Sequence, residues 1–319
     1  MIRPIGGETL IGIGRRRFRG EIVLTPTDSG VLVVNRLPLE EYLRGVVPLE
    51  IGTDRRADEH AAVEAQAVAA RSYVVARMRG TQGQAYDLGD GVTDQVYGGA
   101  SAERAVSDAA VRATTGLVLL AGGRVVTAPY HSSCGGSTAE PQEVWQSGPE
   151  PHLRRVSDRI PGTDRNYCDI APQPTWTRQL EQDQLRRTLD RYLPAYAALP
   201  AGGVGRIREL RVEQTTPSGR VATLALVTDG GVFRLRGNQI RYVLRDAAGG
   251  ILRSTYFTLR RTTPVRRGES APVAILDGRG NGHGVGMCQW GAIGRARAGQ
   301  DFRAILNTYY PGTSVGYAR

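Results

Sequence analysis

The sequence contains no lysine, so all 41 basic residues are arginine, and the formal net charge is +10. The use of arginine alone could reflect codon usage in a GC-rich genome. It could also reflect function, because guanidinium groups pair well with carboxylates and phosphates, and a basic surface favours binding of an anionic polymer. The arginines are scattered apart from Arg15-Arg16-Arg17, so we expect no dedicated nucleic-acid surface.

Cysteine is also scarce. Three cysteines in 319 residues exclude a complete disulfide framework. No stretch approaches the roughly 20 apolar residues of a membrane span, and Met1-Ile2-Arg3-Pro4 does not begin a signal peptide. From the residues alone we expect a chain without a membrane span, which is either cytoplasmic or has lost an export segment. The 40% apolar content is that of an ordinary globular protein.

Hydrophobic periodicity predicts an α+β fold. Apolar residues at helical spacing predict a long helix over 58–79, and apolar runs divided by turns predict β structure over 18–37. Further helices are expected at 102–113, around 185–193 and around 302–309, a hairpin at 117–127, and strands at 207–212, 221–227, 232–235, 256–259 and 273–276. We interpret residues 1–319 as one catalytic unit, with mixed helices and antiparallel β structure around a central substrate cleft and a β-rich lobe at 175–260.

Two segments have less regular patterns. A short helix is expected to enter through Pro38 and to break at Val46-Val47-Pro48-Leu49-Glu50, because proline removes a helical hydrogen bond. The segment 141–174 is rich in proline, glycine and polar residues. It is long for a structureless loop, which favours a lid or a cleft wall.

A glycine-rich loop at 277–286 contains a single histidine, His283. The loop lacks the Lys-Ser/Thr ending and the βαβ context of a phosphate cradle, so that interpretation is weak. Alternating glycines instead allow the backbone to approach a ligand or another segment closely. A histidine among glycines is hard to explain as core packing, and we expect His283 to have a functional role.

The segment from Tyr130 to Thr138 places His131, Ser132, Ser133 and Cys134 side by side. Nucleophilic hydrolysis is one interpretation. A polar turn that lines a site without reacting is favoured, because the base of a triad normally comes from a separate element.

The spacing of His131 and Cys134 suits a metal site, which Cys168 and Cys288 could complete, with His283 as an alternative ligand. A structural zinc ion, inert buried thiols and a Cys134–Cys168 disulfide all remain open.

Five motifs, in order along the chain, together resemble the stage II sporulation protein D family, which includes the amidase enhancer proteins. They are Tyr42 to Glu50, Glu64 to Tyr73, Asp94 to Gly99, His131 to Gly136, and Gly280 to Ala292 with Tyr309-Tyr310-Pro311-Gly312-Thr313 closing the pattern. The matches span residues 18 to 313.

The resemblance implies a lytic transglycosylase that acts outside the cytoplasm, in the periplasm or cell wall. Such an enzyme cleaves the MurNAc–GlcNAc β-1,4 bond of glycan strands that lack stem peptides and leaves a 1,6-anhydro-MurNAc end. The family's catalytic glutamate corresponds to Glu50, acting as general acid and then as base. No cofactor is required for this chemistry, and some family members bind zinc through cysteine and histidine.

Further side chains in the motifs are candidates for glycan binding. Arg71 could steer a muramyl carboxylate, and the other candidates could bind or line the path of a sugar: Gln66, Gln95, Tyr97, Ser132, Ser133, His283 and Gln289.

Two alternatives to the transglycosylase remain. A non-enzymatic amidase enhancer would bind peptidoglycan and stimulate a cell-wall amidase. A metal-dependent hydrolase would use the Cys/His cluster, although three thiolates suit a closed structural site better. The chain departs from the family pattern at Ile51-Gly52, where Met-Pro is more usual.

Overall fold

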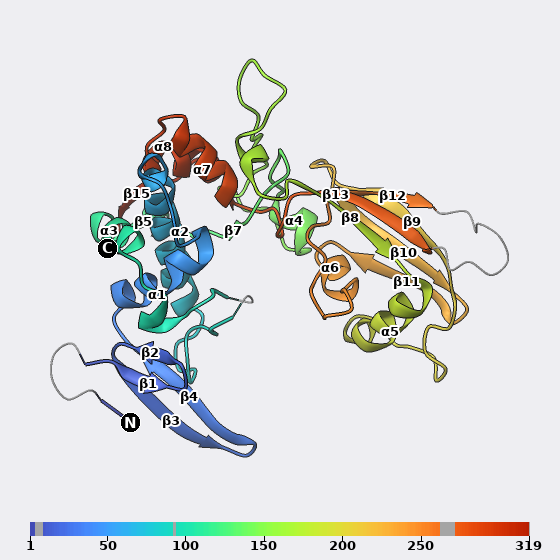
Figure 1. Cartoon of the computed structure of the whole chain (residues 1–319), viewed down its shortest axis with the longest axis horizontal. Helices are drawn as coiled ribbons and strands as arrows, with labels where there is room; N and C mark the ends of the chain where they lie inside the picture. Colours follow the sequence, from blue (N-terminus) through green and yellow to red (C-terminus); the bar gives the residue numbers. More distant parts are fainter. Residues whose placement is uncertain (4–8, 92–93, 262–271, 319) are drawn as a thin grey trace. The chain divides into compact units, whose positions relative to one another are not determined.

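The computed structural model describes residues 1–3, 9–91, 94–261 and 272–318 (Figure 1). Contacts divide the chain into two compact units. Unit 1 comprises Met1–Pro129 and Ala292–Arg319, and unit 2 comprises Tyr130–Gly291. The sequence was interpreted as one catalytic unit; its expected β-rich lobe at 175–260 lies wholly within unit 2. Helices and mainly antiparallel strands confirm the α+β class. No helix in the described ranges is long and apolar enough to cross a membrane.

Unit 1 combines helices with small sheets. Its helices are α1 (Leu39–Ile51), α2 (His60–Met78), α3 (Ala105–Ala113) and α8 (Phe302–Tyr309), with most of α7 (Gln289–Arg297). Its strands are β1 (Ile11–Ile13), β2 (Arg16–Phe18), β3 (Glu21–Thr27), β4 (Gly30–Arg36), β5 (Leu117–Ala121), β6 (Arg124–Val125) and β15 (Ser314–Tyr317). The pairs β1–β2 and β3–β4 and the sheet β15–β5–β6 are antiparallel.

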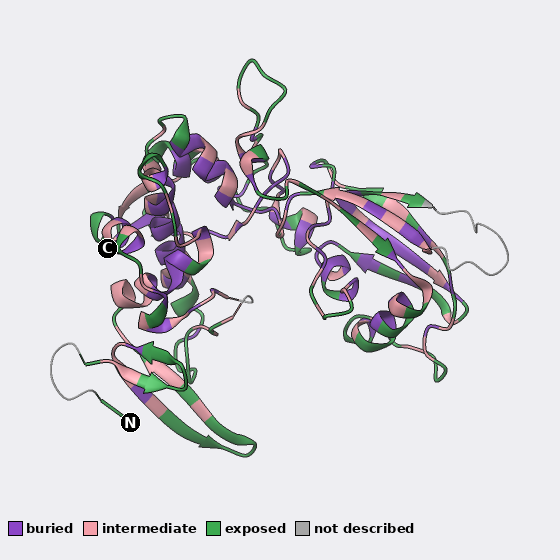
Figure 2. Ribbon diagram, in the orientation of Figure 1, coloured by how far each residue is buried: buried purple, intermediate pink, exposed green. Residues whose placement is uncertain are grey.

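Helix α2 is the centre of unit 1 and confirms the helix expected at 58–79. It contacts α1, α3, α8 and β5, and buried residues follow one another along most of its length (Figure 2). Many of them are alanines, including Ala65, Ala67, Ala69 and Ala70. Small side chains allow neighbouring elements to approach closely, which explains how one helix is covered on several sides.

Arg71 projects from α2 into this packed interior and is only 1% exposed. Its guanidinium donates two hydrogen bonds to the Glu40 carboxylate of α1, at 2.8 and 2.7 Å. It also donates to the carbonyl oxygens of Leu117 and Val111. One guanidinium therefore joins α1 and α2 to the end of α3 and the start of β5.

Helix α1 continues past the expected break. Instead of ending before Val46, it runs to Ile51 with Pro48 inside its last turns. Val46, Val47 and Ile51 are buried, and this burial offsets the hydrogen bond that proline removes. The Gly52 amide closes the helix on the Pro48 carbonyl at a φ of +103°, a conformation that glycine adopts readily.

Unit 2 is built on two three-stranded antiparallel sheets. One has the order β11–β10–β9 and the other β12–β13–β8. Its strands are β7 (Tyr130–His131), β8 (Thr175–Leu180), β9 (Ile207–Thr215), β10 (Val221–Thr228), β11 (Gly231–Arg236), β12 (Phe257–Arg261), β13 (Ala274–Arg279) and β14 (Met287–Cys288). Its helices are α4 (Pro141–Val144), α5 (Gln182–Tyr192) and α6 (Gln239–Val243).

The core of unit 2 gathers residues from both sheets and from α5 and α6. Leu189 of α5, Leu224 of β10, Leu276 of β13 and Ile240 of α6 are fully buried in it. A short parallel pairing of β7 with β14 places His131 opposite Cys288. The distant motifs around residues 131 and 285 therefore lie side by side.

We expect Arg71→Met to lower the free energy of unfolding by at least about 2 kcal/mol, because the change leaves the Glu40 carboxylate and enclosed carbonyl groups without their donor. Urea denaturation of the full chain would measure the loss. Arg112→Met is the matched control, since Arg112 is exposed on α3 and should change stability by less than about 1 kcal/mol. Equal effects of both substitutions would contradict a framework role for Arg71.

Candidate functional site

Glu50 lies in the last turn of α1 and is half-buried. Its Oε1 accepts a hydrogen bond from the Val96 amide at 2.8 Å. Val46, Val47 and Ile51 of the same helix are buried, whereas Leu49 is 41% exposed. Glu50 is therefore a helical carboxylate fixed by a neighbouring backbone segment, beside the apolar side of α1.

Tyrosines and Gln95 form a polar group beside Glu50. The Tyr42 hydroxyl donates to Gln95 Oε1 at 3.2 Å, and the ring of Tyr42 stacks on that of Tyr97 with centroids 5.0 Å apart. The Tyr97 hydroxyl donates to Asn35 at 2.7 Å. Burial, and next the charge of Glu50, raise the pKa of Tyr42. These hydroxyls are therefore neutral hydrogen-bond donors at neutral pH.

The other expected glycan-binding residues of unit 1 are enclosed. Gln66 is fully buried, and Gln95 is 1% exposed with its amide donating to the Ala70 carbonyl. Arg71 is occupied by Glu40 and by backbone carbonyls. Arg71 therefore joins α2 to α1, and Gln95 joins the segment after residue 94 to α2.

Asp94 is a second carboxylate near this group that the sequence analysis did not single out. Its oxygens accept hydrogen bonds from the Gly89 amide and from the Tyr73 hydroxyl. Burial raises the pKa of Tyr73 to about 12, and the Asp94 charge contributes. Asp94 therefore fixes the loop at residue 89 and the Tyr73 hydroxyl.

The three cysteines of the chain converge in unit 2. Cys134, Cys168 and Cys288 are buried together with Asp158, and one potential ligand atom of each lies within 4.8 Å of all the others. The Sγ of Cys134 lies 3.6 Å from that of Cys168 and 3.7 Å from Asp158 Oδ2. We call these four residues the thiol–carboxylate cluster; it could hold a metal ion.

The sequence left zinc, inert thiols and a disulfide open. All three cysteines are free, and the 3.6 Å separation of Cys134 and Cys168 is far beyond the roughly 2.05 Å of a disulfide bond, which removes the disulfide. The donor set fits a thiophilic cation, because three sulfurs and one carboxylate oxygen can make a tetrahedral site.

Backbone amides support negative charge in the thiol–carboxylate cluster. The amides of Cys134 and Gly291 both approach the Cys288 sulfur at 3.2 Å, and the Cys168 amide donates to Asp158 at 3.0 Å. Hydrogen bonds from the neighbouring thiols lower the pKa of Cys168, whereas burial raises the pKa values of Cys134 and Cys288. Burial therefore opposes the ionisation of Cys134 and Cys288.

The fourth member of the cluster is Asp158 rather than His131, which the sequence analysis favoured. His131 Nδ1 faces the Val285 carbonyl at 3.1 Å, and its buried Nε2 has no hydrogen-bond partner among the described residues. His283, the alternative ligand, faces the Tyr130 carbonyl at 2.8 Å and accepts from the Val285 amide. Both imidazoles are tied to the β7–β14 region.

The histidines form an aromatic row with Trp145. The ring of His283 lies 5.4 Å from that of His131 and 5.0 Å from that of Trp145, which is 41% exposed. Burial lowers the pKa of His283 to about 3 and also lowers the pKa of His131. Both histidines are therefore neutral at neutral pH.

The remaining expected residues surround the cluster. Ser133 is buried and pairs through its backbone with Asn281, while the Ser132 carbonyl accepts from the Trp290 amide. Gln289 begins α7 and is 7% exposed. Ser133 thus anchors the glycine-rich loop and Ser132 the start of α7, and neither is engaged as a nucleophile by a histidine among the described contacts.

Sequence reasoning missed Asp158 and Arg220. Asp158 is one acidic residue in a polar loop, and no spacing rule marks it. Arg220 is 2% exposed and donates to the carbonyl oxygens of Cys134 and Ser137, both at 2.9 Å. It places a buried positive charge beside the thiol–carboxylate cluster, and nothing in a chain with 41 basic residues distinguishes it.

Known proteins match both parts of the sequence. The stage II sporulation protein family model matches residues 27–120, and a domain of unknown function matches residues 173–286. Stage II sporulation protein D of Bacillus subtilis is 30% identical over 301 residues, covering 89% of this chain and 76% of that protein. The chain belongs to the stage II sporulation protein D family.

Other relatives are similar over most of the chain. An uncharacterised protein of Brachyspira hyodysenteriae is 28% identical over 310 residues, covering 97% of this chain and 74% of that protein. The amidase enhancer of Bacillus subtilis is 28% identical over 310 residues. The match covers 86% of this chain but only 40% of the enhancer. The similarity to stage II sporulation protein D covers parts of both units, whereas the match to the family model lies within unit 1.

Proposed function

We propose that this protein is a lytic transglycosylase that cleaves the MurNAc–GlcNAc β-1,4 bond of peptidoglycan glycan strands, with Glu50 as acid and base. The supporting observation is the half-buried Glu50 carboxylate, held by the Val96 amide beside neutral tyrosine hydroxyls. Family membership supports a role at the cell wall and therefore outside the cytoplasm.

The reaction needs one carboxyl group in two roles. As an acid, Glu50 donates its proton to the glycosidic oxygen as the bond to C1 breaks. As a base, it then accepts the proton of the muramyl C6 hydroxyl, which attacks C1 and closes the 1,6-anhydro ring. The nucleophile belongs to the substrate and is already positioned, so the second carboxylate of a hydrolytic glycosidase is not needed. The Asp94 carboxylate already accepts hydrogen bonds from Gly89 and Tyr73, which agrees with a mechanism that uses one carboxylate.

The amidase enhancer is the second candidate function, and the similarity to the Bacillus subtilis amidase enhancer favours it directly. The enclosed positions of Gln66, Arg71 and Gln95 also suit a stable scaffold that binds glycan and a cell-wall amidase. Such a protein would need neither the acid nor the base of Glu50.

We further propose that the thiol–carboxylate cluster binds a structural zinc ion. Zinc would supply the positive charge that lets all three thiols ionise together, and no cofactor takes part in the glycan chemistry. Four protein ligands would leave no open position, which favours a structural ion over a catalytic one. Arg220 would offset part of the negative charge of three thiolates and one carboxylate.

Glu50→Gln should reduce the formation of 1,6-anhydromuramyl ends by at least about 100-fold, the scale of general acid–base catalysis. The measurement is mass spectrometry of peptide-free glycan strands after incubation with the protein. Asp54→Asn is the matched control, because Asp54 is exposed shortly after Glu50 and should leave the rate unchanged. Strands left intact by the unaltered protein would exclude the transglycosylase and favour the enhancer, and hydrated reducing ends would show a hydrolase.

Asp158→Asn and Cys168→Ser should each weaken zinc binding by at least about tenfold, because each removes a proposed ligand. Metal analysis of the purified protein and competition with a chromophoric chelator would measure this. His131→Gln should retain zinc, because His131 lies outside the cluster. Loss of zinc in His131→Gln with retention in Asp158→Asn would instead support the ligand set expected from the sequence.

A further inference from the structure

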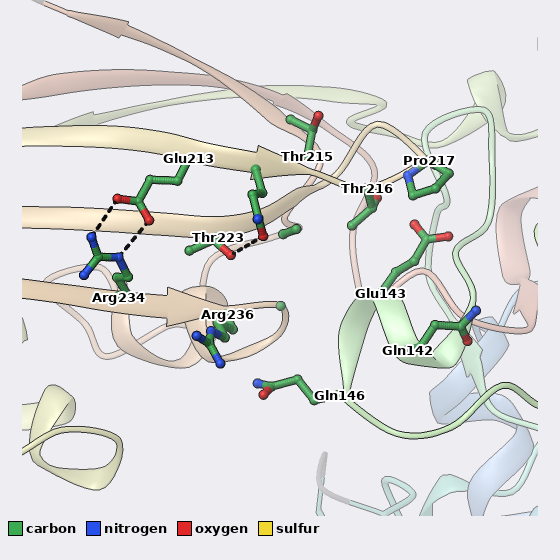
Figure 3. A pocket seen from close by; sticks show the side chains of 13 residues that line it. Gln142, Glu143, Gln146, Glu213, Thr215, Thr216, Pro217, Thr223, Arg234 and Arg236 are labelled. Carbon is green, nitrogen blue, oxygen red and sulfur yellow. Dashed lines mark hydrogen bonds and ion pairs between the residues drawn. The ribbon is translucent and has the colours of Figure 1, made fainter.

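Unit 2 contains an open polar cavity of about 670 Å³ that none of the family motifs includes. It lies where α4 meets the ends of β9, β10 and β11 (Figure 3). Its lining includes Gln142, Gln146, Gln214, Thr215 and Arg236. None of its lining residues is aromatic, so the cavity suits a ligand that is bound by hydrogen bonds and charge.

A close backbone contact fixes the two sides of this cavity. The Asn238 amide donates to the Val144 carbonyl at 2.9 Å, joining the end of α4 to the turn after β11. Between them, a Cβ added at Gly237 would lie 2.4 Å from the same Val144 oxygen. Only glycine fits this contact, which holds the segments carrying Gln146 and Arg236 next to each other.

Gln146 has a φ of +55°, the one positive φ of a residue other than glycine among the described residues. This left-handed conformation is unfavourable for a glutamine, and such strain is concentrated at functional positions. Gln146 has no hydrogen bond to any described residue. Figure 3 shows its side chain extending toward Arg236 across the cavity.

Two carboxylates and two guanidiniums line the cavity. Glu213 is held by Arg234 through hydrogen bonds of 2.9 and 3.2 Å. Glu143 accepts from the amide and hydroxyl of Ser218. The backbone amide of Arg236 donates to Gln239, and no hydrogen bond or ion pair within the described structure engages its exposed guanidinium, which is therefore available to a ligand.

We propose that this cavity is a glycan-binding site for a sugar chain that carries carboxylates, with Arg236 pairing with a carboxylate and Gln146 with neighbouring hydroxyls. The guanidinium fork matches a carboxylate, and amide side chains can donate to and accept from sugar hydroxyls. The lining belongs to unit 2, whereas Glu50 belongs to unit 1. The inference rests on the proposed function only for the choice of muramyl strands as the first polymer to test.

Hydrogen exchange with mass spectrometry on the full-length Glu50→Gln protein tests the proposal, because this variant does not consume the glycan. Peptide-free muramyl strands should protect residues 142–146 and 231–237. Arg236→Gln, added to the same protein, should raise the strand concentration needed for half protection about tenfold, the scale of a charge-assisted hydrogen bond. Arg206→Gln removes another exposed charge of unit 2, outside the cavity, and should leave the protection unchanged.

Three polymers distinguish binding through carboxylates from binding through sugar hydroxyls alone. Muramyl strands and polygalacturonate both carry carboxylates, and Arg236-dependent protection by either supports the proposal and identifies the sugar accepted. Chitin oligosaccharides carry none and should give no Arg236-dependent protection. Equal protection by chitin, or no protection by either acidic polymer, would overturn the proposal. The activity of the unaltered protein on glycan strands is measured separately, so failure of the transglycosylase proposal is distinguishable from failure of this site.

Gln146→Gly provides a second measurement that does not depend on charge. Glycine relieves the positive φ, so the melting temperature should stay the same or rise, while the loss of the amide should weaken the protection. A purely structural role for Gln146 would not produce this combination. Full protection in the stabilised variant would remove Gln146 from the site.

Discussion

The burial of α2 on several sides is the constraint on which unit 1 depends. Its alanines let α1, α3, α8 and β5 approach closely, and Arg71 supplies the polar connection that an all-alanine helix would lack. The same helix positions the catalytic candidate. Its Ala70 carbonyl accepts from Gln95, and the next residue, Val96, donates to Glu50. The orientation of the Glu50 carboxylate therefore depends on the packing of a helix that does not carry it.

Unit 2 depends on a comparable constraint made from polar groups. Cys134, Asp158, Cys168 and Cys288 bring together segments that are far apart in the sequence. Burying thiols and a carboxylate without a compensating charge is unfavourable, which explains why backbone amides and Arg220 surround the cluster. The cluster fixes the loop that follows β7, and β14 beyond it. Its four-ligand composition suits a fixed structure, which leaves the proposed glycan chemistry to the carboxylate of unit 1.

Local periodicity was sufficient to predict much of the fold, including the helix at 58–79 and the strands of the β-rich lobe, because those patterns depend only on neighbouring residues. Tertiary packing decided the exceptions: Pro48 predicts a break, but burial of its neighbours keeps α1 intact. The site could be predicted less completely, because residue type and spacing do not specify burial. Asp158 is one of 31 acidic residues, and only the fold distinguishes it. Arg71 was expected to face a substrate carboxylate, and the structure supplies Glu40 instead.

These positions also bear on how a glycan polymer could be held. Gln66, Arg71 and Gln95 are buried in unit 1, and the hydrogen bonds of Arg71 and Gln95 join its elements to one another. Glu50, Glu64 and Asp94 are partly exposed carboxylates in the motifs of unit 1. A transglycosylase and an amidase enhancer both need additional groups to grip a strand. Exposed arginines and amides outside the motifs can bind the strand. Two functions could therefore share one fold and differ mainly in whether Glu50 is used as an acid and base.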